Sequence, residues 1–221
     1  MPDSQQFAAL LGSWGVTPET HVVAYDASGG AVAARLWWLL RWVGHEYVSL
    51  LDGGYQAWQA QKLPVVADQP GLMQGGYPVR PGHMPVVNTA DVEQGLEDDS
   101  LVLVDARETD RFDGRAEPID TLAGHIPGAH NRHFRINLDA LGRFRAEADL
   151  QESFRHLLSD TDRQLVSMCG SGVTACQNLF AMELAGVDFT DAGAPALYVG
   201  SWSEWIRSAG RPVEALLETI N

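Results

Sequence analysis

The chain has 221 residues, of which 45% are hydrophobic and 20% are charged, and its formal net charge is -14. This length suits one large domain or two small ones, and no apolar run approaches the roughly 18 residues that a membrane-spanning helix needs. The strong negative charge argues against nucleic acids and anionic membranes as partners, because both attract basic surfaces.

Strand-like and helix-like segments alternate along the first part of the chain, as in parallel α/β proteins. In chain order they are a helix at 7–14, a strand at 21–25, a helix at 31–43, a strand at 48–51 and a helix at 55–61. A segment rich in proline and glycine follows at 63–85, and this composition is typical of a linker.

The alternation resumes beyond this segment. The predicted elements are a buried strand at 101–104, a polar loop up to Gly128, a helix at 150–158, a strand at 164–168, a helix at 173–184, a strand at 196–199 and a helix at 203–208. We therefore predict the α/β fold class, with an open parallel sheet flanked by helices.

The two parts resemble each other, which indicates a duplicated domain. One strand leads to Asp26 and another leads to Cys169, and a Ser/Gly turn and a helix follow each of them. The spacing Gly-x-x-x-x-Trp then occurs in both parts, at 53–58 and at 200–205. The first copy has fewer residues before the strand that leads to Asp26 than the second copy has before the strand that leads to Cys169. We predict a partial, inactive domain at 1–66, a linker at 67–86 and a complete catalytic domain at 87–221. A partial domain exposes a sheet edge, so we also expect either a homodimer or a rearranged N-terminus.

We expect the chemistry to depend on Cys169, which follows a buried strand. Glycines in the loop after it allow successive backbone N–H groups to point into one concavity, and the next helix adds its partial positive charge. Both features favour a thiolate, although a buried structural cysteine is the alternative. The loop residues predicted to bind substrate are Gly170, Ser171, Gly172, Val173 and Thr174.

Other classes of cysteine site fit the sequence less well. Tyrosine phosphatases carry an arginine where this chain has Ala175, so phosphate transfer is disfavoured. Cys169 and Cys176 have the spacing of neither a zinc site nor a Cys-x-x-Cys pair, and we interpret Cys176 as a buried apolar residue. We expect neither a metal nor a cofactor. The N-terminus lacks the features of a secretory signal, which predicts a cytoplasmic protein.

A small anionic substrate needs local positive charge, which this acidic chain must supply at the site itself. The loop after the strand at 101–104 begins at a strand's carboxyl end, where ligands bind in open α/β sheets. We predict that Arg111 of this loop binds the substrate and that Arg107 pairs with Asp105 or Glu108. Arg132 is a further cation near the same edge. Asp105 is expected to orient the active loop.

Motifs in this order resemble those of tandem-domain rhodaneses, in the branch of 3-mercaptopyruvate and thiosulfate sulfurtransferases. They are Val-Asp-Ala-Arg at 104–107, Arg-Phe at 111–112, Gly-His-Ile-Pro-Gly-Ala at 124–129, the loop at 169–175 and Gly-Ser-Trp-Ser-Glu-Trp at 200–205. The resemblance also covers 21–65, where Asp26 stands at the position that is inactive in this family's N-terminal domain.

The resemblance implies that the Cys169 thiolate takes the outer sulfur of a small anionic donor as a persulfide. A thiol acceptor, such as a thioredoxin-like protein or a small thiol, or cyanide then removes this sulfur. By the same resemblance Arg111 binds the donor and Ser171 polarises it. His125 is interpreted as a brace of its turn and not as a general base. Thiosulfate enzymes of the family carry cations at the positions of Gly170 and Ser171, so neutral residues there favour 3-mercaptopyruvate.

The chain departs from the family in one charged position. Many mercaptopyruvate enzymes carry a further arginine before the Gly-His-Ile-Pro segment, whereas the corresponding stretch here reads Glu-Pro-Ile-Asp at 117–120. The short first domain also lacks residues that line the cleft in the family. A second hypothesis is therefore a catalytically degenerate rhodanese-like module for interaction or sulfur carriage.

Overall fold

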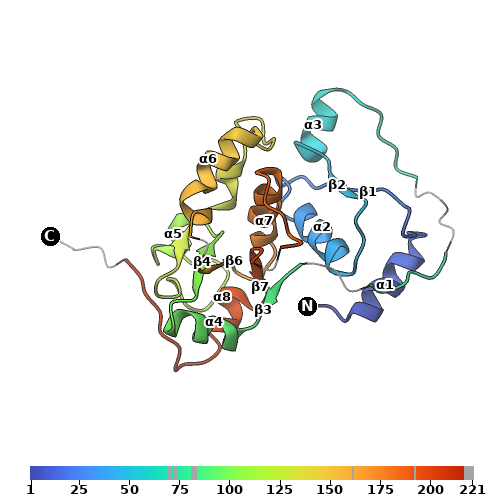
Figure 1. The fold of residues 1–221 in the computed structure, drawn as a ribbon. Helices are drawn as coiled ribbons and strands as arrows, with labels where there is room; N and C mark the ends of the chain where they lie inside the picture. Colours follow the sequence, from blue (N-terminus) through green and yellow to red (C-terminus); the bar gives the residue numbers. More distant parts are fainter. Residues whose placement is uncertain (69–70, 72–73, 81–83, 161, 192, 217–221) are drawn as a thin grey trace.

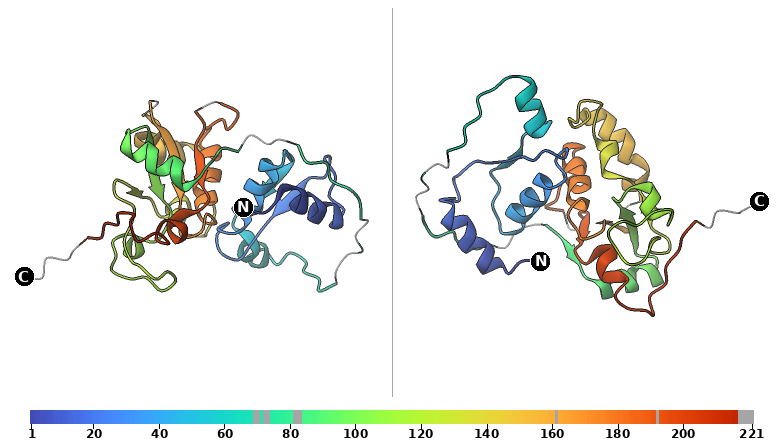
Figure 2. Two further views of the ribbon diagram at one scale, coloured as in Figure 1. Left: turned by 90° about the horizontal axis from the view of Figure 1, so that it is seen from below. Right: turned by 180° about the vertical axis from the view of Figure 1, so that it is seen from behind.

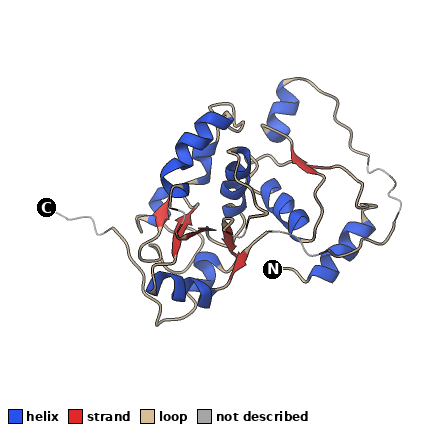
Figure 3. Ribbon diagram, in the orientation of Figure 1, coloured by secondary structure: helices blue, strands red, loops and turns tan. Residues whose placement is uncertain are grey.

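The computed structural model describes residues 1–68, 71, 74–80, 84–160, 162–191 and 193–216. Its strands form a two-stranded sheet and a five-stranded sheet, and both are parallel (Figure 1). Helices surround the strands of the larger sheet (Figure 3). The predicted α/β class is therefore confirmed. No helix of the described residues is long and apolar enough to cross a membrane.

The first part of the chain is built around the two-stranded sheet. Its elements are α1 (Ser4–Ser13), β1 (Val22–Ala24), α2 (Ala33–Trp42), β2 (Val48–Leu50) and α3 (Gly54–Ala60). Helix α1 begins after Asp3, whose carboxylate accepts hydrogen bonds from the N–H groups of Gln5 and Gln6 at 3.0 Å. Such a cap satisfies N–H groups that have no partner within the first turn of a helix.

The second part of the chain contains the five-stranded sheet, in the order β3-β7-β6-β4-β5. Its elements are β3 (Val86–Val87), α4 (Thr89–Glu97), β4 (Leu101–Asp105), α5 (Thr109–Phe112), β5 (His130–Asn131), the 3-10 helix η1 (Phe134–Asn137), α6 (Glu147–Leu158), β6 (Gln164–Met168), α7 (Ala175–Leu184), β7 (Ala196–Tyr198) and α8 (Ser201–Trp205). Strand β6 lies in the centre, so both of its edges are paired, with Val104 opposite Ser167 on one side.

Apolar side chains cover both faces of the larger sheet. Along β4, Val102 and Val104 point into one core cluster and Leu101 and Leu103 into another, because successive side chains of a strand alternate between faces. Helices α6 and α7 contribute to the first cluster, and α4 and α8 contribute to the second. This two-sided burial explains why the strands read as continuous apolar runs.

Helix α2 of the first part packs against α7 of the second part, as both views of Figure 2 show. Trp37 is 1% exposed, and its ring meets the ring of Phe180 edge-on at 5.1 Å. Ala34, Trp37 and Trp38 belong to the same core cluster as Cys176 and Leu179 of α7. The first part of the chain therefore completes the hydrophobic core on one face of the larger sheet.

Each of the two parts contains an equivalent hydrogen bond from the repeated tryptophan. The indole N–H of Trp58 donates to the carbonyl of Pro64 at 3.0 Å, and that of Trp205 donates to the carbonyl of Pro212 at 2.9 Å. The tryptophan of the Gly-x-x-x-x-Trp spacing therefore makes the same kind of hydrogen bond in both parts, although the glycine differs, with φ 75° at Gly53 and -62° at Gly200.

Some predicted boundaries are wrong. The helix predicted at 203–208 is α8, Ser201–Trp205, and the helix predicted from residue 173 starts at Ala175. The loop predicted up to Gly128 contains α5, and α4 was not predicted. Helix α4 carries few apolar residues, and its main signal is local: the Asn88 side chain accepts from residues 90 and 91, and the Asp91 side chain accepts from the backbone N–H of Asn88.

Candidate active site

Cys169 lies directly after the central strand β6, at the carboxyl edge of the sheet, and is 2% exposed. Its N–H donates to Oγ of Ser201 at 3.2 Å, and its carbonyl accepts from the N–H of Trp202 at 3.0 Å. The Gly170 carbonyl accepts from the N–H of Ser203 at 2.9 Å. The start of α8 thus holds the first two residues of the loop in place.

Ser201 supports this contact with an unusual backbone conformation. Its φ of 53° lies in the left-handed region, which residues other than glycine rarely adopt. Its hydroxyl donates to the carbonyl of Tyr198 at 2.8 Å and accepts from Cys169. Strain of this kind persists where the surroundings overdetermine it, and such positions gather at functional sites.

The turn after Cys169 presents a row of backbone N–H groups. Gly172 has φ 74°, and α7 begins three residues later at Ala175. Within the described part of the chain, the N–H groups of residues 171–175 donate to no protein acceptor. Successive N–H groups in such a turn, followed by a helix N-terminus, form a site for an anion. The turn predicted from the glycines is therefore present.

The corresponding turn in the first part of the chain holds an anion of its own. After β1, one carboxylate oxygen of Asp26 accepts from the N–H groups of Ser28 and Gly30 at 2.7 and 2.9 Å. The other accepts from those of Val32 and Ala33, both at 2.8 Å. Partial burial raises the pKa of Asp26, but these four hydrogen bonds lower it more, so the pKa lies below its ordinary value of 3.8.

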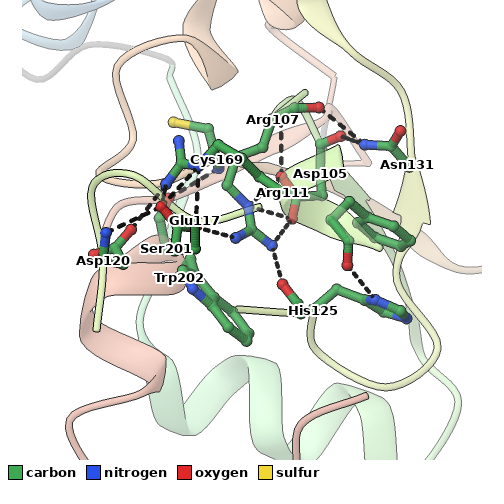
Figure 4. A network of polar contacts seen from close by, with 12 residues as sticks. Asp105, Arg107, Arg111, Glu117, Asp120, His125, Asn131, Cys169, Ser201 and Trp202 are labelled. Atoms are coloured by element: carbon green, nitrogen blue, oxygen red, sulfur yellow. Dashed lines mark hydrogen bonds and ion pairs between the residues drawn. The ribbon is translucent and has the colours of Figure 1, made fainter. Parts of the chain in front are cut away.

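Arg111 projects from α5 toward the loop after Cys169 (Figure 4). Both of its terminal nitrogens lie 3.7 Å from the point that a Cβ on Gly170 would occupy. The predicted substrate cation and the predicted nucleophile's loop are therefore brought together. Two carboxylates already engage this guanidinium: Nε donates to both oxygens of Glu117 at 3.0 Å, and Nη2 donates to Asp120 at 3.0 Å.

Glu117 is the buried centre of this ion-pair network, with a side chain that is 4% exposed. It accepts from Arg111 and from the N–H groups of Ile119 and Asp120, both at 3.0 Å, and lies 3.6 Å from Arg107. Burial raises the pKa of Glu117, but the hydrogen bonds from Arg111 and the backbone lower it more. Its carboxylate therefore stays charged at neutral pH.

Arg107 and Asp105 form a buried ion pair beside the site. Asp105 accepts from Nε and Nη2 of Arg107 at 2.9 and 2.7 Å, as predicted, and Nη2 also donates to the Gly124 carbonyl at 2.7 Å. The guanidinium lies 4.5 Å over the ring of Trp202. Among the described residues, the hydrogen bonds and the ion pair of the Asp105 carboxylate all involve Arg107, so Asp105 holds the guanidinium that lies over Trp202.

His125 is held against α5. One ring nitrogen, Nδ1, lies 2.8 Å from the carbonyl of Phe112, and the two rings stack with centroids 3.8 Å apart. Its backbone pairs with that of Glu214 in both directions. These contacts fit the predicted brace.

Arg132, considered above as a further cation, is 5% exposed and belongs to a buried polar network. It donates to Asn137, Asn178 and Ser153 and lies over the ring of Phe154. Desolvation and the nearby charge of Arg145 lower its pKa to about 9. Its hydrogen bonds hold η1 and α6 to α7, and no contact with the Cys169 loop is found in the described structure.

Cys176 is fully buried, which confirms its interpretation as an apolar residue. Its thiol donates to the Gly172 carbonyl at 3.3 Å, and burial raises its pKa to about 12. Arg35 of α2 reaches the same place, with Nη1 3.5 Å from that carbonyl and 3.7 Å from the sulfur. Arg35 was not predicted as part of the site, because nothing near it in the sequence links α2 to this loop.

Comparisons with known proteins agree on the family. The model of the rhodanese-like domain matches residues 1–61 and 88–208. The chain belongs to the rhodanese family. This rhodanese chain is 44% identical to a probable 3-mercaptopyruvate sulfurtransferase of Pseudomonas aeruginosa, over 96% of the chain and 74% of the relative. It is 37% identical to the human 3-mercaptopyruvate sulfurtransferase, over 99% and 73%. The solved structure of the Tum1 protein of Saccharomyces cerevisiae matches its fold with a TM-score of 0.83 at 24% identity, over 99% of the chain and 77% of that structure.

The rhodanese site of this chain combines side chains with the backbone N–H groups of the turn after Cys169. No group of three or more His, Cys, Asp or Glu side chains is arranged to hold a metal ion in the described residues. In the sequence, Glu117 and Asp120 stood out only as the ends of the stretch that lacks the family's further arginine. Ser201 and Ser203 were seen only as members of a motif. Their contacts with Cys169, Gly170 and Arg111 depend on how distant loops meet, which no local pattern shows.

Proposed function

We propose that this rhodanese chain is a sulfurtransferase in which Cys169 takes sulfur from 3-mercaptopyruvate and passes it to a thiol or to cyanide. The observation that carries the proposal is the turn at 171–175, whose N–H groups have no protein acceptor in the described structure. The equivalent turn after β1 holds the carboxylate of Asp26 with four such groups. A turn of this construction therefore stabilises a negative charge, either on the Cys169 thiolate or on its persulfide.

The proposed reaction has two steps. The Cys169 thiolate attacks the sulfur of the donor, so that an S–S bond forms and the C–S bond breaks. The electron pair of the C–S bond remains on the carbon as an enolate, and a proton from solvent converts it to pyruvate. An acceptor thiolate or cyanide then attacks the outer sulfur of the persulfide, and the Cys169 thiolate leaves. The backbone N–H groups of the turn stabilise the negative charge before and after each transfer.

The charges beside the loop support 3-mercaptopyruvate over thiosulfate as donor. Gly170 and Ser171 supply no positive charge, and Arg111 is the cation that lies next to Gly170. Thiosulfate carries two negative charges, whereas 3-mercaptopyruvate carries one when its thiol is protonated. The relatives named above as 3-mercaptopyruvate sulfurtransferases support the same preference.

Replacing the nucleophile tests the proposal directly. We expect Cys169→Ser to lose sulfur transfer to cyanide from both donors, because a hydroxyl cannot carry the persulfide. The matched control Cys176→Ala removes the other thiol, which is buried, and should still accept sulfur. Intact-mass measurement after incubation with 3-mercaptopyruvate should show a gain of one sulfur atom in the unchanged chain and in the control. Persistent transfer by Cys169→Ser would contradict the assignment.

The degenerate module remains the second candidate, favoured by the two carboxylates that already engage Arg111. If this candidate is correct, the unchanged chain gains no sulfur from either donor in the same mass measurement.

For the whole chain we propose the division into a partial domain at 1–66, a linker at 67–86 and a catalytic domain at 87–221. The two separate sheets and the matching hydrogen bonds of Trp58 and Trp205 support it. The homodimer and the cytoplasmic location stay predictions from sequence.

A further inference from the structure

Only some of the N–H groups of the Arg111 guanidinium are free to bind a sulfur donor. Nε and Nη2 face Glu117, with Nη2 2.8 Å from one of its oxygens, and Nη2 also donates to Asp120 at 3.0 Å. Among the described residues, Nη1 donates to no acceptor, and it lies beside Gly170. An arginine binds a carboxylate most strongly through two parallel N–H groups. With two carboxylates in place, Nη1 is the group left for a donor.

Asp120 is fixed in this position by a second contact. One of its oxygens accepts from the hydroxyl of Ser203 at 2.8 Å, and the other accepts from Arg111. Ser203 also binds the loop, because its N–H donates to the Gly170 carbonyl at 2.9 Å. The oxygen that faces Arg111 lies 3.8 Å from the point where a Cβ on Gly170 would be. A fixed negative charge therefore lies next to the residue after Cys169.

The charges of the network do not balance. Arg107 pairs with Asp105 and Glu117, and Arg111 pairs with Glu117 and Asp120, so two arginines meet three carboxylates. Asp105 and Glu117 are 0% and 4% exposed, whereas Asp120 is 11% exposed and lies toward the loop. The surplus negative charge that a donor meets is therefore the carboxylate of Asp120. Each additional negative charge on the donor increases the repulsion from this carboxylate.

We infer that Asp120 determines donor specificity by charge: held between Arg111 and Ser203 beside Gly170, it disfavours the dianion thiosulfate relative to donors with one negative charge. This inference rests on the proposed sulfurtransferase function. It assigns a role to the stretch in which the family's further arginine is missing. A cation in this stretch would attract a dianion. Asp120 instead accepts a hydrogen bond from Nη2 of Arg111, and its negative charge repels a dianion.

The test compares two donors in one variant. We expect Asp120→Asn, which keeps the size of the side chain, to raise the ratio of kcat/KM for thiosulfate to kcat/KM for 3-mercaptopyruvate by about tenfold or more, mainly through a lower KM for thiosulfate. Added salt should reduce this gain, because ions screen partly exposed charges. The matched control is Asp110→Asn, which removes the same charge from α5, where Asp110 is exposed and pairs with Arg115. Its ratio should stay within about twofold of the unchanged chain.

A second variant keeps the inference testable if Asp120→Asn does not fold. Ser203→Ala removes one anchor of Asp120 and should shift the ratio in the same direction by a smaller factor. An unchanged ratio in the folded variants, or an equal shift in Asp110→Asn, would overturn the inference. Sulfur loading of the unchanged chain separates the two proposals. If the chain gains sulfur but the ratio does not move, only the role of Asp120 is wrong. If it gains none from either donor, the proposed function fails as well.

Discussion

The side chain of Asp26 satisfies the backbone N–H groups of its own turn. Four backbone N–H groups between 2.7 and 2.9 Å satisfy its carboxylate, and they in turn are satisfied by it. Buried or partly buried N–H groups without a partner are costly. The carboxylate therefore stabilises the turn after β1, which corresponds to the turn after Cys169 in the second part of the chain.

We predict that Asp26→Asn lowers the free energy of unfolding by about 1–2 kcal/mol at neutral pH, because an amide has one acceptor oxygen and no charge. The loss stays this small because Asp26 is partly solvated. The pKa of Asp26 is lowered in the folded state, so its stabilisation is present above the ordinary value of 3.8 and is lost as the pH falls through the folded value. Urea unfolding at pH 7 and near pH 3 should show the difference between the two proteins shrinking at the lower pH. A constant difference would contradict this account.

The sequence was informative about single residues where a motif is local. The placement of Cys169, its glycine turn and Arg111 near one another could be predicted because each follows the carboxyl end of a strand, and such ends meet at one edge of a parallel sheet. The carboxylates of Glu117 and Asp120 could not, because the loop from 113 to 128 has no periodic pattern. Its path is decided by distant contacts, such as the hydrogen bonds of Arg107 to Gly124 and of Ser203 to Asp120.

At the scale of elements, the packing of α2 on α7 links the two parts of the chain. Trp37 is 1% exposed and meets Phe180 and Phe189 edge-on. Helix α7 begins at the turn after Cys169, so this contact supports the element that presents the N–H groups.

We expect Trp37→Ala to lower the free energy of unfolding by about 3–5 kcal/mol, since a large buried ring is lost and leaves a cavity. Trp14→Ala is the matched control, because Trp14 is 43% exposed, and its effect should be much smaller. Chemical denaturation of the three proteins measures both effects. A loss for Trp37→Ala as small as the loss expected for Trp14→Ala would show that α2 contributes little to the core.

Strands with an apolar run of their own were predicted, and the two-residue strands were not. Strand β6 (Gln164–Met168) has the predicted bounds, because a run of apolar residues between turn signals defines it. Strands β3 and β5 have two residues each, and their pairing with β7 and β4 comes from the tertiary fold. Such pairing leaves no pattern in the sequence.

At the scale of the whole molecule, the first part of the chain serves as a structural partner of the second. Ala34, Trp37 and Trp38 of α2 lie in the core cluster that includes Cys169 and Cys176. Arg35 adds polar contacts from α2 to Gly172 and Cys176. The resemblance between the two parts was visible in the sequence, but their contact was not, because it joins residues far apart along the chain.

We predict that residues 84–216 produced alone lose cooperative unfolding and bind a hydrophobic dye, because the apolar face of α7 is no longer covered by α2. The full chain serves as the control under the same conditions. A cooperative transition of the shorter chain at the same denaturant concentration would show that the second part is stable by itself.

The difference between the two turns has a consequence for the working cycle. The turn after β1 carries its anion in its own sequence, as Asp26, whereas the turn after β6 has only the sulfur of Cys169 at the corresponding place. Under the proposed mechanism, a persulfide anion on Cys169 would accept hydrogen bonds from this turn in the folded state, and the unfolded chain offers no such turn. The sulfur-loaded chain would then be more stable than the free chain, and each transfer of sulfur to an acceptor would return it to its less stable form.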